Sequence, residues 1–149
     1  NLIPCCKDCN HNKGTSGPNS TETQFLHAYY DDLTADRWLY AAIVEGSPPG
    51  ATFHVDPPEE WDEATSARVR RHFEKLKLAR LYASQAGRQL QNIRRSLSRI
   101  YEAAGADVVS ADLLERSLSC AEVSFNSWDG ALYEAASKSD WFCNGGFRA

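Results

Sequence analysis

The sequence predicts an α+β chain with a cysteine-rich start, a β-hairpin and a mostly α-helical C-terminal region. Three observations support this class. Two cysteines separated by two residues, Cys6 and Cys9, stand at the front among polar residues. Aromatic and branched residues fill two short runs on either side of a Ser-Pro-Pro-Gly turn within 38–55, which indicates a hairpin. Apolar residues then recur at four- and three-residue intervals across much of 61–104, which is typical of amphipathic helices.

Length and composition set the outer bounds. With 149 residues, the chain can form one core that buries about 68–70% of its unfolded surface. No apolar run approaches the roughly 18 residues that a membrane-spanning helix needs. Five cysteines, an odd number with two of them adjacent, argue against a secreted disulfide framework. We therefore expect a soluble, cytoplasmic protein that does not contact membranes.

The front of the chain contains a Cys-x-x-Cys knuckle. Cys6 and Cys9 have the spacing that lets two thiolates reach one tetrahedral zinc ion at about 2.3 Å. Taken alone, the pair is compatible with unpaired thiols, a redox pair or half of a zinc site. Asn10, His11 and Lys13 follow directly, where the first turn of a helix would bring polar groups close to a phosphate or a hard cation.

The first fourteen residues resemble the second half of the HNH endonuclease motif, the ββα-metal finger of homing, colicin-type and phage-associated nucleases. The resemblance rests on an Asn that opens a short apolar strand, the Cys-x-x-Cys pair, an Asn in the third motif position and a Lys shortly after it. It implies that Asn1 and Asn10 belong to the catalytic site, where Asn1 braces the finger loop and Asn10 ligates a divalent metal, expected to be Mg²⁺. It also implies that Cys6 and Cys9 hold a structural Zn²⁺ and that Lys13 contacts a phosphate.

Two positions depart from the family pattern. Cys5 stands where an apolar residue is usual, so it either packs as a small hydrophobe or competes as a ligand. His11 lies one residue past the expected metal position, and we expect it to face solvent, with a phosphate contact as the alternative. The Asp-His pair of the family motif is not in this sequence, which also has no Met. We therefore expect an inactive fragment with a partial finger at 1–20 and an accessory region at 21–149.

For the intact parent, the resemblance implies hydrolysis of nucleic-acid phosphodiester bonds, in a bacterial or phage setting, with DNA as a more probable substrate than RNA. In that reading a divalent metal stabilises the developing charge and the missing His deprotonates the attacking water. The alternative belongs to another class of protein. It is a zinc-knuckle adaptor without catalysis, whose helical region docks a partner. The sequence leaves the oligomeric state open.

Several elements are expected after the front segment. Residues 21–33 predict a short helix with His27 and Asp31 four residues apart on one side. Such a pair most often forms a hydrogen bond or salt bridge, and a metal site is the alternative. Residues 38–44 and 51–55 predict the two strands of the hairpin, with His54 exposed on the polar side of the second strand. Helices are expected at 61–78 and 78–104, and Gly105 is expected to end the second one.

Two further helices are predicted toward the C-terminus. The first covers 111–123, with Ser110 as its N-cap and three leucines facing inward (Leu113, Leu114, Leu118). The second runs from 126 to about 139. Cys120 and Cys143 are interpreted as buried free thiols rather than ligands.

The net charge of −4 hides a strong segregation. Residues 68–99 contain ten basic residues and one acid, a net of +9, so the rest of the chain carries −13. Arg88, Arg95 and Arg99 fall opposite the apolar side of the helix predicted at 78–104. Two interpretations stay open: the ordinary charged surface that most amphipathic helices show, which is the more common case, and a face that binds the nucleic-acid backbone, favoured by the near absence of acids.

Overall fold

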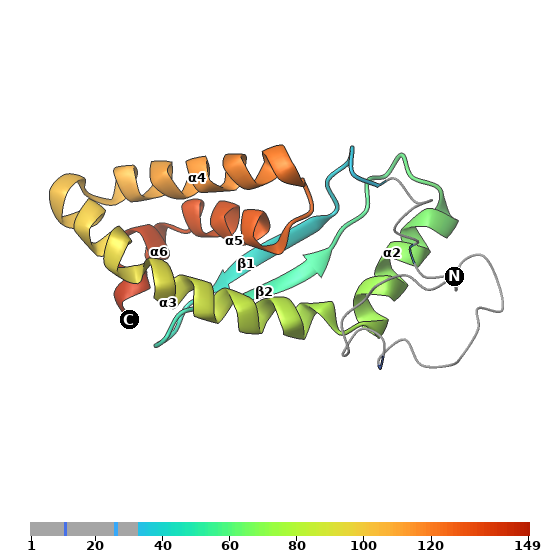
Figure 1. Cartoon of the computed structure of the whole chain (residues 1–149), viewed down its shortest axis with the longest axis horizontal. Coiled ribbons are helices and arrows are strands. Elements are labelled where there is room, and N and C mark those ends of the chain that lie inside the picture. Colours follow the sequence, from blue (N-terminus) through green and yellow to red (C-terminus); the bar gives the residue numbers. More distant parts are fainter. Residues whose placement is uncertain (1–10, 12–25, 27–32) are drawn as a thin grey trace.

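The computed structural model describes residues 11, 26 and 33–149. In this part of the chain an antiparallel hairpin precedes a mostly helical region, so the predicted α+β class is confirmed (Figure 1). The elements, in order, are β1 (Leu39–Val44), β2 (Gly50–Val55), α2 (Glu63–Lys75), α3 (Leu78–Ala104), α4 (Ala106–Val123), α5 (Trp128–Ser137), α6 (Asp140–Cys143) and the 3-10 turn η2 (Gly146–Arg148). Apart from His11, the predicted finger lies outside the described residues, as does nearly all of the predicted helix at 21–33, with His27 and Asp31.

The hairpin has one buried and one exposed face. Its register pairs Leu39 with Val55 and places Tyr40 opposite His54. Phe53 is buried whereas His54 is exposed, as the alternation predicted. The half-buried ring of Tyr40 and the exposed ring of His54 stack with their centroids 5.8 Å apart. The buried face therefore turns toward α3 and α5, and α4 covers the far side of α5 (Figure 1).

Helix α2 begins after a capping side chain and ends before a left-handed residue. Asp62 caps it, because one carboxylate oxygen accepts the Thr65 backbone N–H at 2.9 Å. This bond is stronger to the ionised carboxylate, so it lowers the pKa of Asp62 below its usual value. The helix ends at Lys75 instead of the predicted residue 78, because Lys77 adopts the left-handed backbone conformation, with φ of 54°. The chain then turns directly into α3.

The bounds predicted for the long helix α3 are confirmed. Its inward side is buried along most of its length by residues at the predicted spacing (Ala86, Leu90, Ile93, Leu97). Gly105 ends the helix with a φ of 82°, and its N–H donates to the Tyr101 carbonyl at 2.9 Å. That left-handed conformation favours glycine, which has no Cβ.

The predicted start of α4 is wrong. The helix begins at Ala106, immediately after Gly105, so Ser110 lies inside it and is not its cap. The Ser110 hydroxyl donates instead to the Ser137 carbonyl at 2.8 Å and joins α4 to the end of α5. Because Gly105 reverses the chain within one residue, the extra helical turn can bury Val109 completely. Burial of that side chain is worth about 1.5–3 kcal/mol.

The predicted inward leucines of α4 are only partly correct. Leu113 is buried, but Leu114 and Leu118 are 43% and 52% exposed. The contact between α4 and α5 is made by small residues, since the Ser117 hydroxyl donates to the Gly130 carbonyl at 3.0 Å. Leu114 and Leu118 lie about 100° and 140° from Leu113 around the helix axis, so they face outward when Leu113 is buried.

Helix α5 and the C-terminal tail complete the core. Ser127 caps α5, and its hydroxyl accepts the Gly130 N–H at 3.2 Å, so the fourth predicted helix is confirmed. Phe142 and Phe147 pack edge to face and are fully buried. Cys143 is buried as predicted, and burial raises the pKa of its thiol.

Cys120, in contrast, is only half-buried. In the described part of the chain, no helix combines the length and the apolar character needed to cross a membrane.

Candidate nucleic-acid interface

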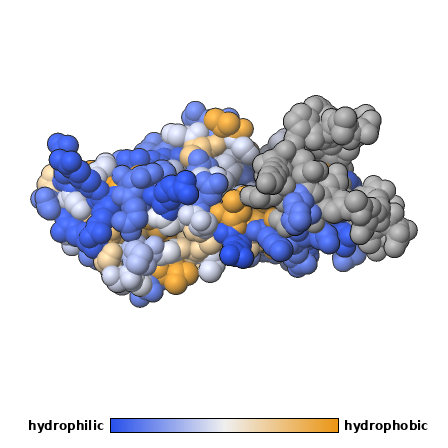
Figure 2. Space-filling model, turned by 60° about the horizontal axis from the view of Figure 1, so that its bottom comes forward, coloured by the Kyte–Doolittle hydropathy of each residue, from blue (hydrophilic) through white to orange (hydrophobic). Residues whose placement is uncertain are grey.

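The outward side of α3 carries three exposed arginines, Arg88, Arg95 and Arg99, here called the arginine row. At 3.6 residues per turn, Arg95 and Arg99 lie within about 20° of Arg88 around the helix axis and about 10 and 16 Å along it. Figure 2 brings the lower edge of Figure 1 forward, where α3 runs, and most of the described surface on this side is hydrophilic. The three guanidinium groups are therefore presented together on one straight element.

Helix α3 carries one acid, Glu102, whose carboxylate is paired with Arg148. The sequence contains no Asp or Glu between Lys75 and Tyr101. Within the described part of the chain, none of the three guanidinium groups has a hydrogen-bond or ion-pair partner. A structural face usually places Glu four residues from Lys or Arg, where the two form a pair. The acid nearest to the arginine row, Glu102, is three residues from Arg99 but pairs with Arg148, so the positive field of the row is available to an external anion.

Arg94 has a different role from its neighbour Arg95. Its guanidinium donates to the carbonyl of Arg148 in the C-terminal tail. Arg148 in turn donates to the Ser98 carbonyl at 3.2 Å and to the Glu102 carboxylate at 3.0 Å. These bonds hold the tail against α3. Arg94 and Arg148 are therefore structural residues, and Arg94 does not belong to the arginine row.

A shallow hollow of about 500 Å³ lies beside the last two arginines of the row. Arg95 and Arg99 line it together with Ser96, Ile100 and Ala103. The small side chains of Ser96 and Ala103 leave space between the longer ones, so a phosphate group could approach both guanidinium groups. Sequence reasoning did not single out Ser96, because a serine on the exposed side of a helix has no distinctive sequence signal.

The remaining predicted site residues cannot be placed. They lie outside the described residues (Asn1, Cys6, Cys9, Asn10, Lys13). His11 is helical and exposed, in line with its predicted contact with solvent. The described residues contain no group of three or more His, Cys, Asp or Glu side chains that could hold a metal ion.

The residues that the resemblance assigns as metal ligands do not complete the coordination of either predicted metal. Cys6 and Cys9 supply two of the four ligands of a tetrahedral zinc site, and Asn10 supplies one oxygen for the divalent metal. These residues alone do not fit either ion. The structure thus confirms the exposure of the arginine row, whereas the predicted metal sites stay predictions.

Comparison with known proteins identifies one phage relative. The chain is 33% identical over 96 residues to protein ea31 of Escherichia phage lambda. The match covers 62% of this chain and 32% of ea31, so the chain spans about a third of the length of that relative. No protein-family profile matches the sequence, and no solved structure matches it significantly. The comparisons therefore relate part of the chain to a phage protein.

Proposed function

We propose that this chain is the C-terminal part of a cytoplasmic, HNH-type, metal-dependent endonuclease, and that its α3 helix holds the backbone of the DNA substrate. The nuclease assignment rests on the resemblance of the first fourteen residues to the HNH motif. The observation that carries the DNA-binding role is the arginine row, three exposed guanidinium groups without partners among the described residues. The single acid on their helix, Glu102, is paired with Arg148.

The chemistry of the arginine row suits a phosphate backbone. A guanidinium group stays protonated and can donate two parallel hydrogen bonds to one phosphate. Each neutralised phosphate releases condensed counterions, which supplies sequence-independent affinity. The acidic surplus elsewhere in the chain would repel DNA from other faces and so orient it toward α3.

The backbone-binding role is tested by the salt dependence of DNA affinity. Replacing two members of the row, Arg95→Gln with Arg99→Gln, should weaken binding to duplex DNA. It should also reduce the slope of log K against log salt by about 0.9 for each lost phosphate contact, about 1.8 in total. Fluorescence anisotropy at several salt concentrations measures both quantities.

The matched control removes two exposed charges from another helix, Arg70→Gln with Lys75→Gln on α2. This control should change the slope much less than the α3 pair does. Equal effects of the two double variants would show that only net charge matters. An unchanged affinity of the α3 pair would leave the arginine row as ordinary surface.

The nuclease assignment has a separate test in the native gene. If the codons before Asn1 encode an Asp-His pair and a second Cys-x-x-Cys, the protein that includes them should nick plasmid DNA with Mg²⁺, and Asn10→Ala should abolish nicking. Equal nicking by both proteins would remove Asn10 from the site. A gene without the Asp-His pair would contradict the nuclease assignment.

That last outcome would favour the second candidate function, a zinc-knuckle adaptor without catalysis. The observation in its favour is apolar surface on α4, where Leu114 and Leu118 are about half exposed. Such surface is often used to bind another protein.

A further inference from the structure

The outward side of α4 carries an apolar strip that continues into the loop before α5. Three large side chains on it are about half exposed, namely Leu114 at 43%, Leu118 at 52% and Phe125 at 53%. Together with Ala121 they form the α4 stripe, with spacings of four, three and four residues. Within α4, the spacing of Leu114, Leu118 and Ala121 places them on one side of the helix, and Phe125 extends the strip from the loop. Clustered exposure of large apolar side chains marks an interaction surface more often than scattered exposure does.

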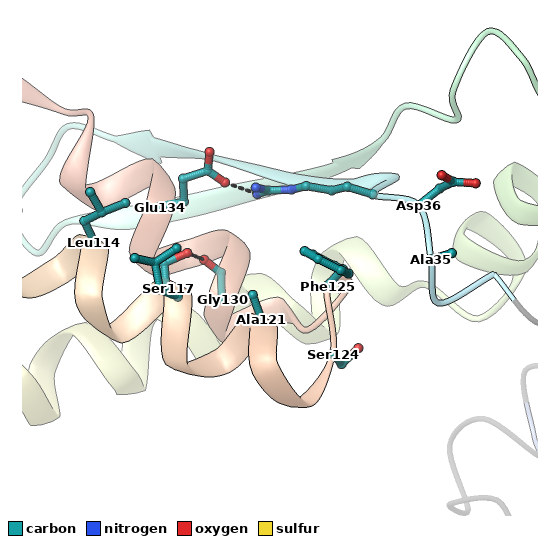
Figure 3. A pocket seen from close by; sticks show the side chains of 11 residues that line it. Ala35, Asp36, Leu114, Ser117, Ala121, Ser124, Phe125, Gly130 and Glu134 are labelled. Atoms are coloured by element: carbon teal, nitrogen blue, oxygen red, sulfur yellow. Dashed lines mark hydrogen bonds and ion pairs between the residues drawn. The ribbon is translucent and has the colours of Figure 1, made fainter.

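A hollow of about 320 Å³ opens beside the α4 stripe (Figure 3). Leu114, Ala121 and Phe125 line it from α4 and the loop, and Ala35 and Asp36 line it from the segment before β1. The contact between α4 and α5 contributes the rest of the lining. This volume is at the lower end of the range for ligand pockets, about 300–1,000 Å³, and is large enough for an aromatic or leucine side chain.

The wall of the hollow is held in place by one side chain. The side-chain oxygen Oδ1 of Asn126 accepts hydrogen bonds from the backbone N–H groups of Trp38 at 2.8 Å and Leu39 at 3.1 Å. Its amide group donates to the Asp36 carbonyl at 2.8 Å. The segment before β1 is thereby tied to the loop between α4 and α5. A preformed hollow lowers the entropy cost of binding.

Acidic residues accompany the α4 stripe. Glu115 and Glu122 are exposed and lie about 60° and 40° from Leu118 around the helix axis. The only basic residue of α4, Arg116, points away from the stripe, and its guanidinium is bound to Asp112 at 2.7 Å. The outward side of α4 therefore presents negative charge next to its apolar residues.

The opposite edge of the hollow also has an ionised carboxylate. Burial raises the pKa of Glu134, but hydrogen bonds and charges from Lys138 and Arg37 outweigh it and lower that pKa below its usual value. Figure 3 shows the ion pair of Glu134 at the hollow, and Asp36 on the neighbouring wall. The two positively charged side chains nearby, Arg37 and Lys138, both pair with Glu134. Asp36 is exposed.

We propose that the α4 stripe and its hollow bind a basic amphipathic helix of a partner protein. Leucine or aromatic side chains of that helix, spaced at three and four residues, would cover the stripe and fill the hollow, as in other helix-in-groove complexes. Its Lys or Arg residues would face Glu115 and Glu122. This inference does not rest on nuclease activity, because none of its residues belongs to the predicted finger or the arginine row.

A second copy of this chain is a poorer match for the same surface. Two α4 helices packed against each other would bring Glu115 and Glu122 of both copies together, where like charges repel. The face of α3 has the complementary charge, but its only exposed large apolar residue is Leu81. Neither helix combines positive charge with a row of apolar side chains.

The test uses a fluorescein-labelled synthetic peptide of eighteen residues, composed of Leu and Lys with Leu along one helical side. Its affinity for the chain is measured by fluorescence anisotropy. Leu118→Ala should weaken binding about tenfold, as expected for a central anchor of an interface. Glu115→Gln with Glu122→Gln should weaken binding and flatten its salt dependence.

Val123→Ala is the matched control, because Val123 is 89% exposed but lies about 140° away from Leu118 around α4. It should leave the affinity unchanged. A thermal melt of each variant shows that the fold is retained, as expected for substitutions of exposed side chains.

Three outcomes would overturn the proposal. The first is no binding, or equal weakening by Leu118→Ala and Val123→Ala. The second is equal affinity for a peptide in which Glu replaces every Lys. The third is concentration-dependent self-association in sedimentation that Leu118→Ala abolishes, since this would make a second copy the occupant.

Discussion

At the scale of single residues, neighbouring side chains of one type perform different tasks. Arg94 and Arg95 are adjacent in the sequence, yet one binds the tail carbonyl of Arg148 and the other is exposed beside a hollow. A rotation of 100° per residue separates them around α3. The charge count therefore identified the basic segment but not which of its arginines are available.

Asn126 is the clearest case of a residue whose importance only its contacts show. Asn126→Ala should lower the free energy of unfolding by about 2 kcal/mol, because the backbone N–H groups of Trp38 and Leu39 lose their acceptor. Urea denaturation measures this change.

The control for this prediction is Asn144→Ala, in an exposed asparagine that makes one local bond to the Asp140 carbonyl. A change within about 0.5 kcal/mol is expected for such a surface substitution. Similar losses for the two variants would show that the Asn126 bridge contributes nothing particular.

At the scale of elements, the distance between α4 and α5 decides which side chains are buried. A Cβ on Gly130 would lie 2.7 Å from the Ser127 hydroxyl and 3.1 Å from the Cys120 Cβ. The two helices can approach because this position has no side chain. The contact side of α4 is that of Val109, Leu113 and Ser117, and Leu114 and Leu118 lie outside it.

Two glycine substitutions test this explanation. Gly130→Ala should destabilise the protein by about 1–3 kcal/mol, the usual cost of overpacking. Gly87→Ala, in α3, should stabilise it by about 0.5–1 kcal/mol, because no atom lies within 4 Å of the added Cβ and alanine is the better helix former. Melting temperatures of the two variants should shift in opposite directions. Shifts of the same sign would contradict the close-approach argument.

At the scale of the whole molecule, the C-terminal tail closes the core beside the turn between α3 and α4 (Figure 1). The fully buried Phe147 contacts Phe142 and the ring of Tyr101, with centroids 5.8 and 6.0 Å away. The guanidinium of Arg148 covers the Tyr101 ring at 5.0 Å. The last residues are therefore part of the core.

Phe147→Ala should destabilise the protein by about 3–5 kcal/mol, the range for a buried phenylalanine. This is a large part of the 5–15 kcal/mol typical of domains. Phe125→Ala removes the same side chain from an exposed position and should cost far less. Chemical denaturation of both variants provides the comparison, and equal losses would show that the tail does not close the core.

Across the whole molecule, positive charge is concentrated on α3, and α4 carries negative charge. The basic α3 faces one side with the arginine row, and α4 carries the acidic residues next to apolar ones on another. The net charge of −4 describes neither surface. The two proposed interfaces accordingly differ in the chemistry of what they would bind.

By itself, the sequence determined the α+β class, the hairpin and its exposed His54, the bounds of α3 and the exposure of the arginine row. These features depend on short-range patterns, namely alternation along a strand, periodicity along a helix and the conformational freedom of Gly105. The tertiary structure alone decided the start of α4, the outward leucines, the tie of Arg94 to the tail and the bridge made by Asn126. The tie of Arg94 and the bridge made by Asn126 join segments far apart in the chain, so no local pattern predicts them. The start of α4 and its outward leucines depend on how α4 packs against α5, where small side chains such as those of Ser117 and Gly130 give no periodic signal.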